Sequence, residues 1–309
     1  MSVSIGARVY LISVYHKSDR RKALAFDTDA YKMPAPQLIS KFISSHAAAT
    51  QSVERERSWY FEEKESGAAG NSKGYIHYGT FGFESNFIDS KTKKRNYRRQ
   101  VSDVEEIPLF YEFWFPSRAR HAFSVFQSFQ GRSCITMVVS KIQEMFEANN
   151  PGLVMSFKKL LANDASGGIY SSVPVKKLRL IKRRAPADLA EKYLGIKPSS
   201  NIDFEVSFAA RRKGSLGAFS ALTGNFKADR TEGVITYDGV DFEEAVAEIR
   251  VGGRTRRVGV FGIGSDAGAI DLSDTIEKGL DGHPTFESLK KESDSLLRDF
   301  HKKISETSL

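Results

Sequence analysis

Nine consecutive residues, Ile107 to Phe115, form the most apolar segment of the chain. Four of the nine are Phe or Trp, side chains that are enriched in β-strands. Pro108 places the start of this strand at an end or an edge, because proline cannot donate a hydrogen bond to a β-ladder. A segment that is apolar at nearly every position predicts a strand covered on both faces. We therefore interpret its aromatic residues as core rather than as platforms for stacking ligands.

The segments around it predict an antiparallel sheet with helices packed against it. His121–Phe129 is expected to be the neighbouring strand, and further strands are predicted at 7–15, 58–63 and 75–83. Ser90 to Tyr97 is expected to be the exposed loop or edge of a hairpin. Apolar residues recur at helical spacing after Pro36 and again from Ile135 to Phe146, which predicts two amphipathic helices.

The second part of the chain predicts shorter, hairpin-rich structure. Strands are expected at 175–184 and 202–209, and residues 245–251 should pair with 254–261 across Gly252-Gly253. We also predict helices from Pro186 to Leu194, from Asp271 to Leu280, and from Pro284 to near the C-terminus. Residues 163–172 are rich in Gly, Ser and Asp, and they predict a linker.

The expected fold class is therefore α+β. We predict two domains: a basic, aromatic-rich α+β domain over residues 1–164, and a smaller α+β domain over residues 165–309. The first would be an antiparallel sheet with packed helices, and the second a smaller β-hairpin-rich part followed by the C-terminal helix.

Positive charge is concentrated locally in a chain whose formal net charge is +8. Six of the nine residues from Lys91 to Arg99 are Lys or Arg, with Tyr97 between them. Cations neutralise phosphates and release counterions, and an interleaved aromatic ring can stack on a base. An equally weighted interpretation is a solvated hairpin tip that keeps a sheet edge from aggregating. The candidate phosphate-contacting residues are Lys93, Lys94, Arg95, Arg98, Arg99, Lys177, Arg179 and Arg183.

No motif in the sequence predicts a catalytic residue, a metal site or a cofactor. A single cysteine, Cys134, excludes an internal disulfide and thiolate-rich metal sites, and it is expected to be buried and inert. The glycine-rich stretch 67–74 lacks the Gly-Lys-Ser/Thr ending of a phosphate loop, and the stretch 262–268 is one residue too long for the dinucleotide fingerprint, so we interpret both as turns. Asp238, Asp241 and Glu248 are the nearest approach to a metal-binding carboxylate set, and a metal-dependent nuclease remains an alternative.

One part of the chain resembles known proteins. Ile107-Pro-Leu-Phe-Tyr111, followed by Phe126-Gln-Ser-Phe-Gln-Gly-Arg132 and then a helix, resembles uncharacterised proteins of bacterial phage-defence islands. The resemblance covers about residues 103–146 and implies a setting in antiviral defence. It implies no catalytic residues.

The expected function is nucleic-acid binding, with DNA favoured over RNA, and the resemblance implies a setting in a bacterial antiviral system. An alternative to nucleic acid as the partner is another protein, or further copies of the chain in a homo-oligomer. In that alternative the chain is a non-catalytic assembly subunit, and the apolar stripe of its C-terminal helix packs on a partner. The sequence contains no long apolar run, so we expect no membrane span and a cytoplasmic location.

Overall fold

The structure is a computed structural model, and it describes residues 5–48, 50–52, 56–67, 70–117, 119–160, 170, 172–196, 198, 202–212, 214–225, 235–251, 254–262, 269–273 and 275–307. The chain forms two compact units. The arm unit comprises Tyr10–Lys158 and Ile276–Ser293, and the terminal unit comprises Met1–Val9, Lys159–Thr275 and Asp294–Leu309. The predicted domain boundary at residues 164 and 165 lies outside the described residues, as does most of the predicted linker.

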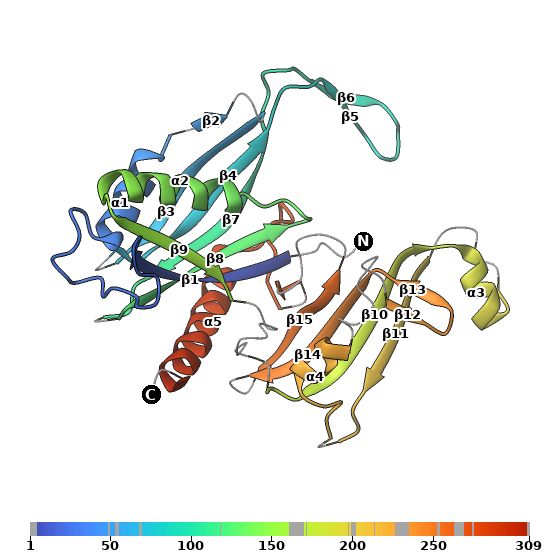
Figure 1. The fold of residues 1–309 in the computed structure, drawn as a ribbon. Helices are drawn as coiled ribbons and strands as arrows, with labels where there is room; N and C mark the ends of the chain where they lie inside the picture. The colour runs from blue at the N-terminus through green and yellow to red at the C-terminus, as the bar shows by residue number, and fades with distance from the viewer. Residues whose placement is uncertain are drawn as a thin grey trace. The chain divides into compact units, whose positions relative to one another are not determined.

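The arm unit is built on an antiparallel sheet in the order β8-β7-β4-β3-β2, with β1 beside β8 and β9 beside β1 (Figure 1). Its strands are β1 (Ile5–His16), β2 (Thr50–Ser52), β3 (Arg57–Ser66), β4 (Ser72–Thr80), β7 (Glu105–Trp114), β8 (His121–Phe129) and β9 (Leu153–Lys159). A separate hairpin, β5 (Ser85–Ile88) and β6 (Arg95–Arg99), lies between β4 and β7 in the chain. The predicted pairing of 107–115 with 121–129 is confirmed.

Strand β7 is buried on both faces, as its continuous apolar character predicts. On one face Tyr111 packs edge-on against Phe61 of β3, with ring centroids 4.9 Å apart. On the other face Phe110 lies 5.8 Å from Phe286, at the start of helix α5 (Phe286–Thr307). The aromatic run is therefore core.

The two helices predicted for the first part of the chain are confirmed as α1 (Ala35–Ser45) and α2 (Ile135–Asn149). Pro34 and Pro36 stand at the start of α1, where a missing backbone N–H costs nothing because the first turn has no intrahelical acceptor. The helices contact each other, and α1 contacts β3. Their buried side chains repeat at three and four residues: Leu38, Ile39, Phe42 and Ile43 in α1, and Ile135, Val138, Ile142 and Phe146 in α2.

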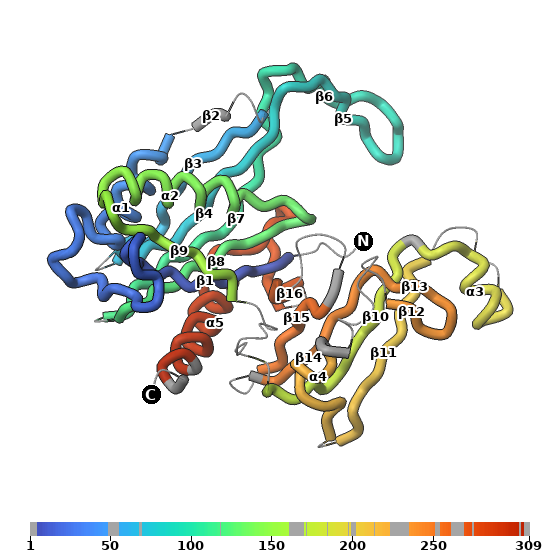
Figure 2. The backbone as a smooth tube through the Cα atoms, in the orientation of Figure 1, coloured from blue at the N-terminus to red at the C-terminus, as the bar shows by residue number. Residues whose placement is uncertain are grey.

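The terminal unit has its own run of antiparallel strands, in the order β11-β10-β14-β15-β16 followed by the first residues of β1 (Figure 2). These strands are β10 (Val175–Ala185), β11 (Ile202–Ala209), β14 (Glu244–Val251), β15 (Arg254–Gly262) and β16 (Ile270–Asp271). A small hairpin pairs β12 (Ile235–Tyr237) with β13 (Val240–Phe242), and two short helices are α3 (Ala187–Leu194) and α4 (Phe219–Asn225). Val251 pairs with Arg254, so the predicted hairpin is confirmed at its closing residues.

The helix predicted from Asp271 to Leu280 is wrong. Asp271 belongs to β16, and the backbone N–H of Leu272 donates to Ile5 of β1 at 2.8 Å instead of to a turn of helix. Leu272 and Ile276 are buried and four residues apart, which imitates a helical pattern, but Leu280 is fully exposed. The described residues between 272 and 280 form turns and an isolated bridge from Lys278 to Pro284, and none of them is helical.

The fold class is α+β, with a large antiparallel sheet, small hairpin sheets and a C-terminal helix, as predicted. The apolar stripe of α5 consists of Leu289, Leu296, Leu297, Phe300 and Ile304. The first four are each at most 2% exposed, and Ile304 is half-buried, so most of the stripe expected to meet a partner is covered within the chain. Among the described residues, no helix combines the length and the apolar character needed to cross a membrane.

Candidate functional site

The β5–β6 hairpin forms an arm that projects from the ends of β4 and β7 (Figures 1 and 2). Its strands pair with each other and with no other strand of the described chain. Ser85 lies opposite Arg99, and Phe87 lies opposite Tyr97. The basic run Lys91–Arg99 thus occupies the tip and the second strand of this arm.

Asp89 organises the tip of the arm. Its carboxylate accepts the backbone N–H groups of Lys91 at 3.0 Å and Thr92 at 2.6 Å. The hydrogen bonds from Thr92 and then Lys91 lower the pKa of Asp89, so the carboxylate stays ionised while it holds the turn. The backbone also closes, because Lys93 N–H donates to Asp89 at 2.9 Å and Asp89 N–H donates to Lys94 at 2.8 Å.

Four cations of the tip point into solvent. They are all exposed, and none of them forms an ion pair with a described residue: Lys91, Lys93, Lys94 and Arg95. We call these four residues the tip cations. Arg98 is also exposed, but its guanidinium lies 2.7 Å from Glu84.

Arg99, in contrast, is 2% exposed and belongs to the base of the arm. It donates to the backbone carbonyls of Thr80 and Asp103 and lies 3.3 Å from the Glu105 carboxylate. Its guanidinium also lies 4.2 Å from the ring centroid of Phe83. These contacts tie both ends of the arm to the sheet, and they leave Arg99 outside the exposed set.

The cations of β10 lie in the terminal unit and face carboxylates. Arg179 makes two 2.7 Å hydrogen bonds to Glu205, which raises the pKa of Arg179 and lowers the pKa of Glu205. Arg183 lies 3.3 Å from Asp203 and 3.5 Å from Glu244. Lys177 is half-buried and lies opposite Glu248 in the sheet. This face of β10 therefore has mixed charge, and it is less suited to an anion than the arm tip.

The carboxylates considered for a metal site each have another partner. Asp238 accepts a hydrogen bond from the Tyr193 hydroxyl at 2.8 Å, and Asp241 accepts one from Thr236 at 2.7 Å. Glu248 lies 3.4 Å from Arg257. Within the described ranges, no group of three or more His, Cys, Asp or Glu side chains could hold a metal ion.

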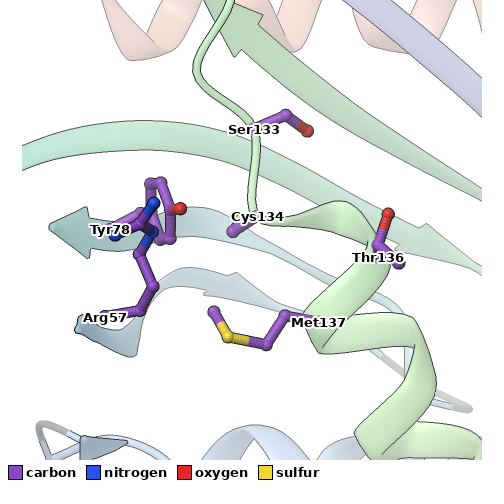
Figure 3. Close-up of a pocket in the computed structure, with 6 residues that line it drawn as sticks. All are labelled: Arg57, Tyr78, Ser133, Cys134, Thr136 and Met137. Atoms are coloured by element: carbon purple, nitrogen blue, oxygen red, sulfur yellow. The ribbon is translucent and has the colours of Figure 1, made fainter. Parts of the chain in front are cut away.

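A cavity of about 420 Å³ lies in the arm unit between β3, β4 and the start of α2. Figure 3 shows Ser133, Cys134, Thr136 and Met137 on one side of it and Arg57 and Tyr78 on the other. Cys134 is buried, and burial raises the pKa of its thiol to about 12. The thiol therefore stays protonated at neutral pH and cannot act as an activated nucleophile. This geometry agrees with the prediction that Cys134 is buried and inert.

The structure also places one histidine between two carboxylates, an arrangement that no sequence motif indicated. His77 of β4 lies 2.9 Å from Glu106 of β7 and 3.0 Å from Glu62 of β3, and its ring stacks on Tyr60 with centroids 4.6 Å apart. Three separate strands supply these residues, so their proximity depends on strand register. Both ring nitrogens contact carboxylates, which anchors the side chain on the sheet surface. The sequence feature that could have indicated this arrangement is the alternation of polar side chains along each strand.

The tip of the arm is therefore the strongest candidate site. It combines four exposed cations with a turn held by Asp89 and with two exposed aromatic rings, Phe87 and Tyr97. Comparisons of the chain with protein-family models and with curated proteins find no match.

Proposed function

We propose that this protein binds nucleic acid through the hairpin arm, with the tip cations contacting phosphates. The observation that carries the proposal is the exposure of these four cations without an ion-pair partner in the described chain. An ammonium or guanidinium that is already paired with a carboxylate contributes less binding free energy when it contacts a phosphate. The tip cations have no such carboxylate partner in the described chain. Asp89 supports the same conclusion, because its charge is directed at backbone N–H groups.

The charge of the arm unit supports a local rather than a diffuse site. This unit contains 24 basic and 20 acidic residues, and six of the basic ones lie between Lys91 and Arg99. The rest of the unit therefore has 18 basic and 20 acidic residues. The positive excess comes from the arm, so an approaching polyanion is attracted to the arm first.

The shape of the arm suits this role. A two-stranded β-ribbon fits the major groove of a duplex, and it can also lie along a single strand. Contacts from lysine and arginine to phosphates depend little on base sequence. We therefore expect binding that tolerates different base sequences and weakens strongly with salt. On duplex DNA, the logarithm of the affinity should fall with the logarithm of the salt concentration, with a slope of about 0.9 for each phosphate contact.

The test is a triple substitution, Lys91→Gln, Lys93→Gln and Lys94→Gln, in the full chain. Binding to a labelled DNA duplex and to an RNA of equal length is measured by fluorescence anisotropy over a salt series. We expect an affinity loss of about tenfold or more at low salt and a slope reduced by about 2 to 3, because three phosphate contacts are removed.

The matched control is Lys22→Gln, Lys32→Gln and Lys41→Gln. These three lysines are exposed, belong to the same unit and form no ion pair with a described residue. The control changes the net charge by the same amount. Equal losses for the two triple variants would mean that overall charge, and not the arm, determines binding, and the proposal would fail.

A further inference from the structure

The arm carries an aromatic pair that phosphate contacts leave unused. Phe87 and Tyr97 lie directly opposite each other in the hairpin, so both side chains extend from the same face. Their ring centroids are 6.0 Å apart and the planes are inclined by 38°. Phe87 is 47% exposed and Tyr97 is 52% exposed, so water contacts about half of each side chain.

One ring of the pair is held in place by a polar contact. The hydroxyl of Tyr97 donates to the carboxylate of Asp103, which also accepts the backbone N–H of Gln100 at 2.7 Å. The hydrogen bond from Tyr97 is the largest cause of a lowered pKa for Asp103, so this carboxylate is ionised at neutral pH. A ring fixed in this way loses less side-chain entropy when a flat ligand stacks on it.

Cations lie near the pair in the chain, on the second strand of the arm and at its tip. Arg95 and Arg98 lie within two residues of Tyr97, and the tip lysines follow Phe87 along the chain. A ligand that combines flat apolar faces with regularly spaced negative charges matches this surface. Single-stranded nucleic acid has both, whereas the base faces of a duplex are already stacked on one another.

We propose that Phe87 and Tyr97 form a stacking platform for unpaired bases, so that the arm prefers single-stranded to double-stranded nucleic acid. This inference rests on the proposed nucleic-acid binding and assigns it a substrate class. The tip cations supply phosphate contacts to either form, and the platform adds a contact that only unpaired bases can make.

The test compares three labelled probes of equal length with the full chain: an oligothymidylate, an abasic strand and a DNA duplex. The abasic strand has the phosphates but no bases. We expect the unsubstituted chain to bind the oligothymidylate most tightly. The double variant Phe87→Leu and Tyr97→Leu should lose about tenfold or more for the oligothymidylate, because stacking on an aromatic ring is worth about that factor per base. Its affinity for the abasic strand and for the duplex should stay the same.

Two further variants separate stacking from other effects. Tyr97→Phe keeps the ring and removes the hydroxyl, so it should bind the oligothymidylate within a few-fold of the unsubstituted chain. Val101→Ala shortens another exposed apolar side chain, two residues beyond the end of the arm, and it should have no effect. A retained preference for the oligothymidylate in the double variant would overturn the platform, as would an equal loss for all three probes.

Failure of the underlying function gives a different result. If the unsubstituted chain binds neither these three probes nor the RNA of the salt series, nucleic-acid binding itself is refuted. If it binds all three with equal affinity and the expected salt dependence, the protein binds phosphates and the platform alone is refuted. A protein ligand for the aromatic pair would also leave the three probes equal.

Discussion

Arg99 illustrates how a cation inside a basic run can stabilise the fold instead of binding an anion. Its N–H groups are directed at two backbone carbonyls and the Glu105 carboxylate, and its plane lies over Phe83. An arginine can do this because its planar guanidinium offers several donors in a fixed arrangement and stacks on aromatic rings. A count of basic residues in the sequence does not separate Arg99 from Arg95, which is exposed.

His121 predicts a stability change at mildly acidic pH. Burial, and then the charge of Arg120, lower the pKa of His121 below its usual 6.5. The unfolded chain therefore takes up this proton at a higher pH than the folded chain does. The free energy of unfolding should consequently fall as the pH drops below 6.5 and through the lowered pKa. His121→Asn should make this decline smaller, as measured by urea unfolding at several pH values.

Ser13 provides the control for that measurement. Its hydroxyl lies 2.8 Å from Nδ1 of His121, so His121→Asn also changes a hydrogen bond. Ser13→Ala removes the hydrogen bond and keeps the titrating ring, and it should lower stability by about 1 kcal/mol while keeping the decline below pH 6.5. An unchanged decline in His121→Asn would contradict the assignment.

At the scale of elements, apolar patterns predicted most strands and helices correctly. The continuous run 107–115 indicated a doubly covered strand, and β7 has aromatic contacts on both faces. The wrong helix at 271–280 shows the limit of such patterns. Two buried residues four positions apart, Leu272 and Ile276, also occur in turns when neighbouring strands supply the hydrogen bonds.

The candidate site was less predictable, because its charges depend on pairing partners. In the sequence, Arg179 and Lys93 are both candidate phosphate-contacting residues. Strand register brings Glu205 beside Arg179, and no carboxylate of the described chain pairs with Lys93. The position of Tyr97 between cations was visible in the sequence, but its location opposite Phe87 required the hairpin register.

A buried charged network links three elements of the arm unit and leads to a stability prediction. Glu112 of β7 is 2% exposed, accepts a hydrogen bond from Ser293 of α5, and lies 3.1 Å from the Lys73 ammonium of β4. Glu112→Gln removes the carboxylate beside a largely buried ammonium. We expect it to lower the free energy of unfolding by about 3 kcal/mol, measured by chemical denaturation.

An exposed ion pair supplies the comparison. Lys141 and Glu144 lie 2.8 Å apart on α2, and both side chains are more than half exposed. Glu144→Gln should cost less than about 1 kcal/mol, because water screens the pair. If Glu112→Gln cost no more than Glu144→Gln, the network around Glu112 would contribute little to joining α5 with the sheet of the arm unit.

At the scale of the whole molecule, the net charge of +8 divides equally between the units. The arm unit has 24 basic and 20 acidic residues, and the terminal unit has 22 and 18. Equal totals hide different distributions. Described cations of β10 in the terminal unit face Glu205, Asp203 and Glu244, whereas the excess of the arm unit is concentrated in the arm. Net charge by itself therefore does not identify the binding surface.

Acid should destabilise both units through carboxylates whose pKa is lowered. Hydrogen bonds from Lys64 and then His77 lower the pKa of Glu62 in the arm unit, and the hydrogen bond from Arg179 lowers that of Glu205 in the terminal unit. Each contribution is complete above the usual value of 4.5 and is lost as the pH falls through the lowered pKa. The midpoint of thermal unfolding should therefore drop over this range, and Glu62→Gln or Glu205→Gln should each make the drop smaller.

The two residues share no partner among the described contacts, so the double variant should show about the sum of the two effects. A drop as steep in the double variant as in the unsubstituted chain would show that other carboxylates determine the acid response.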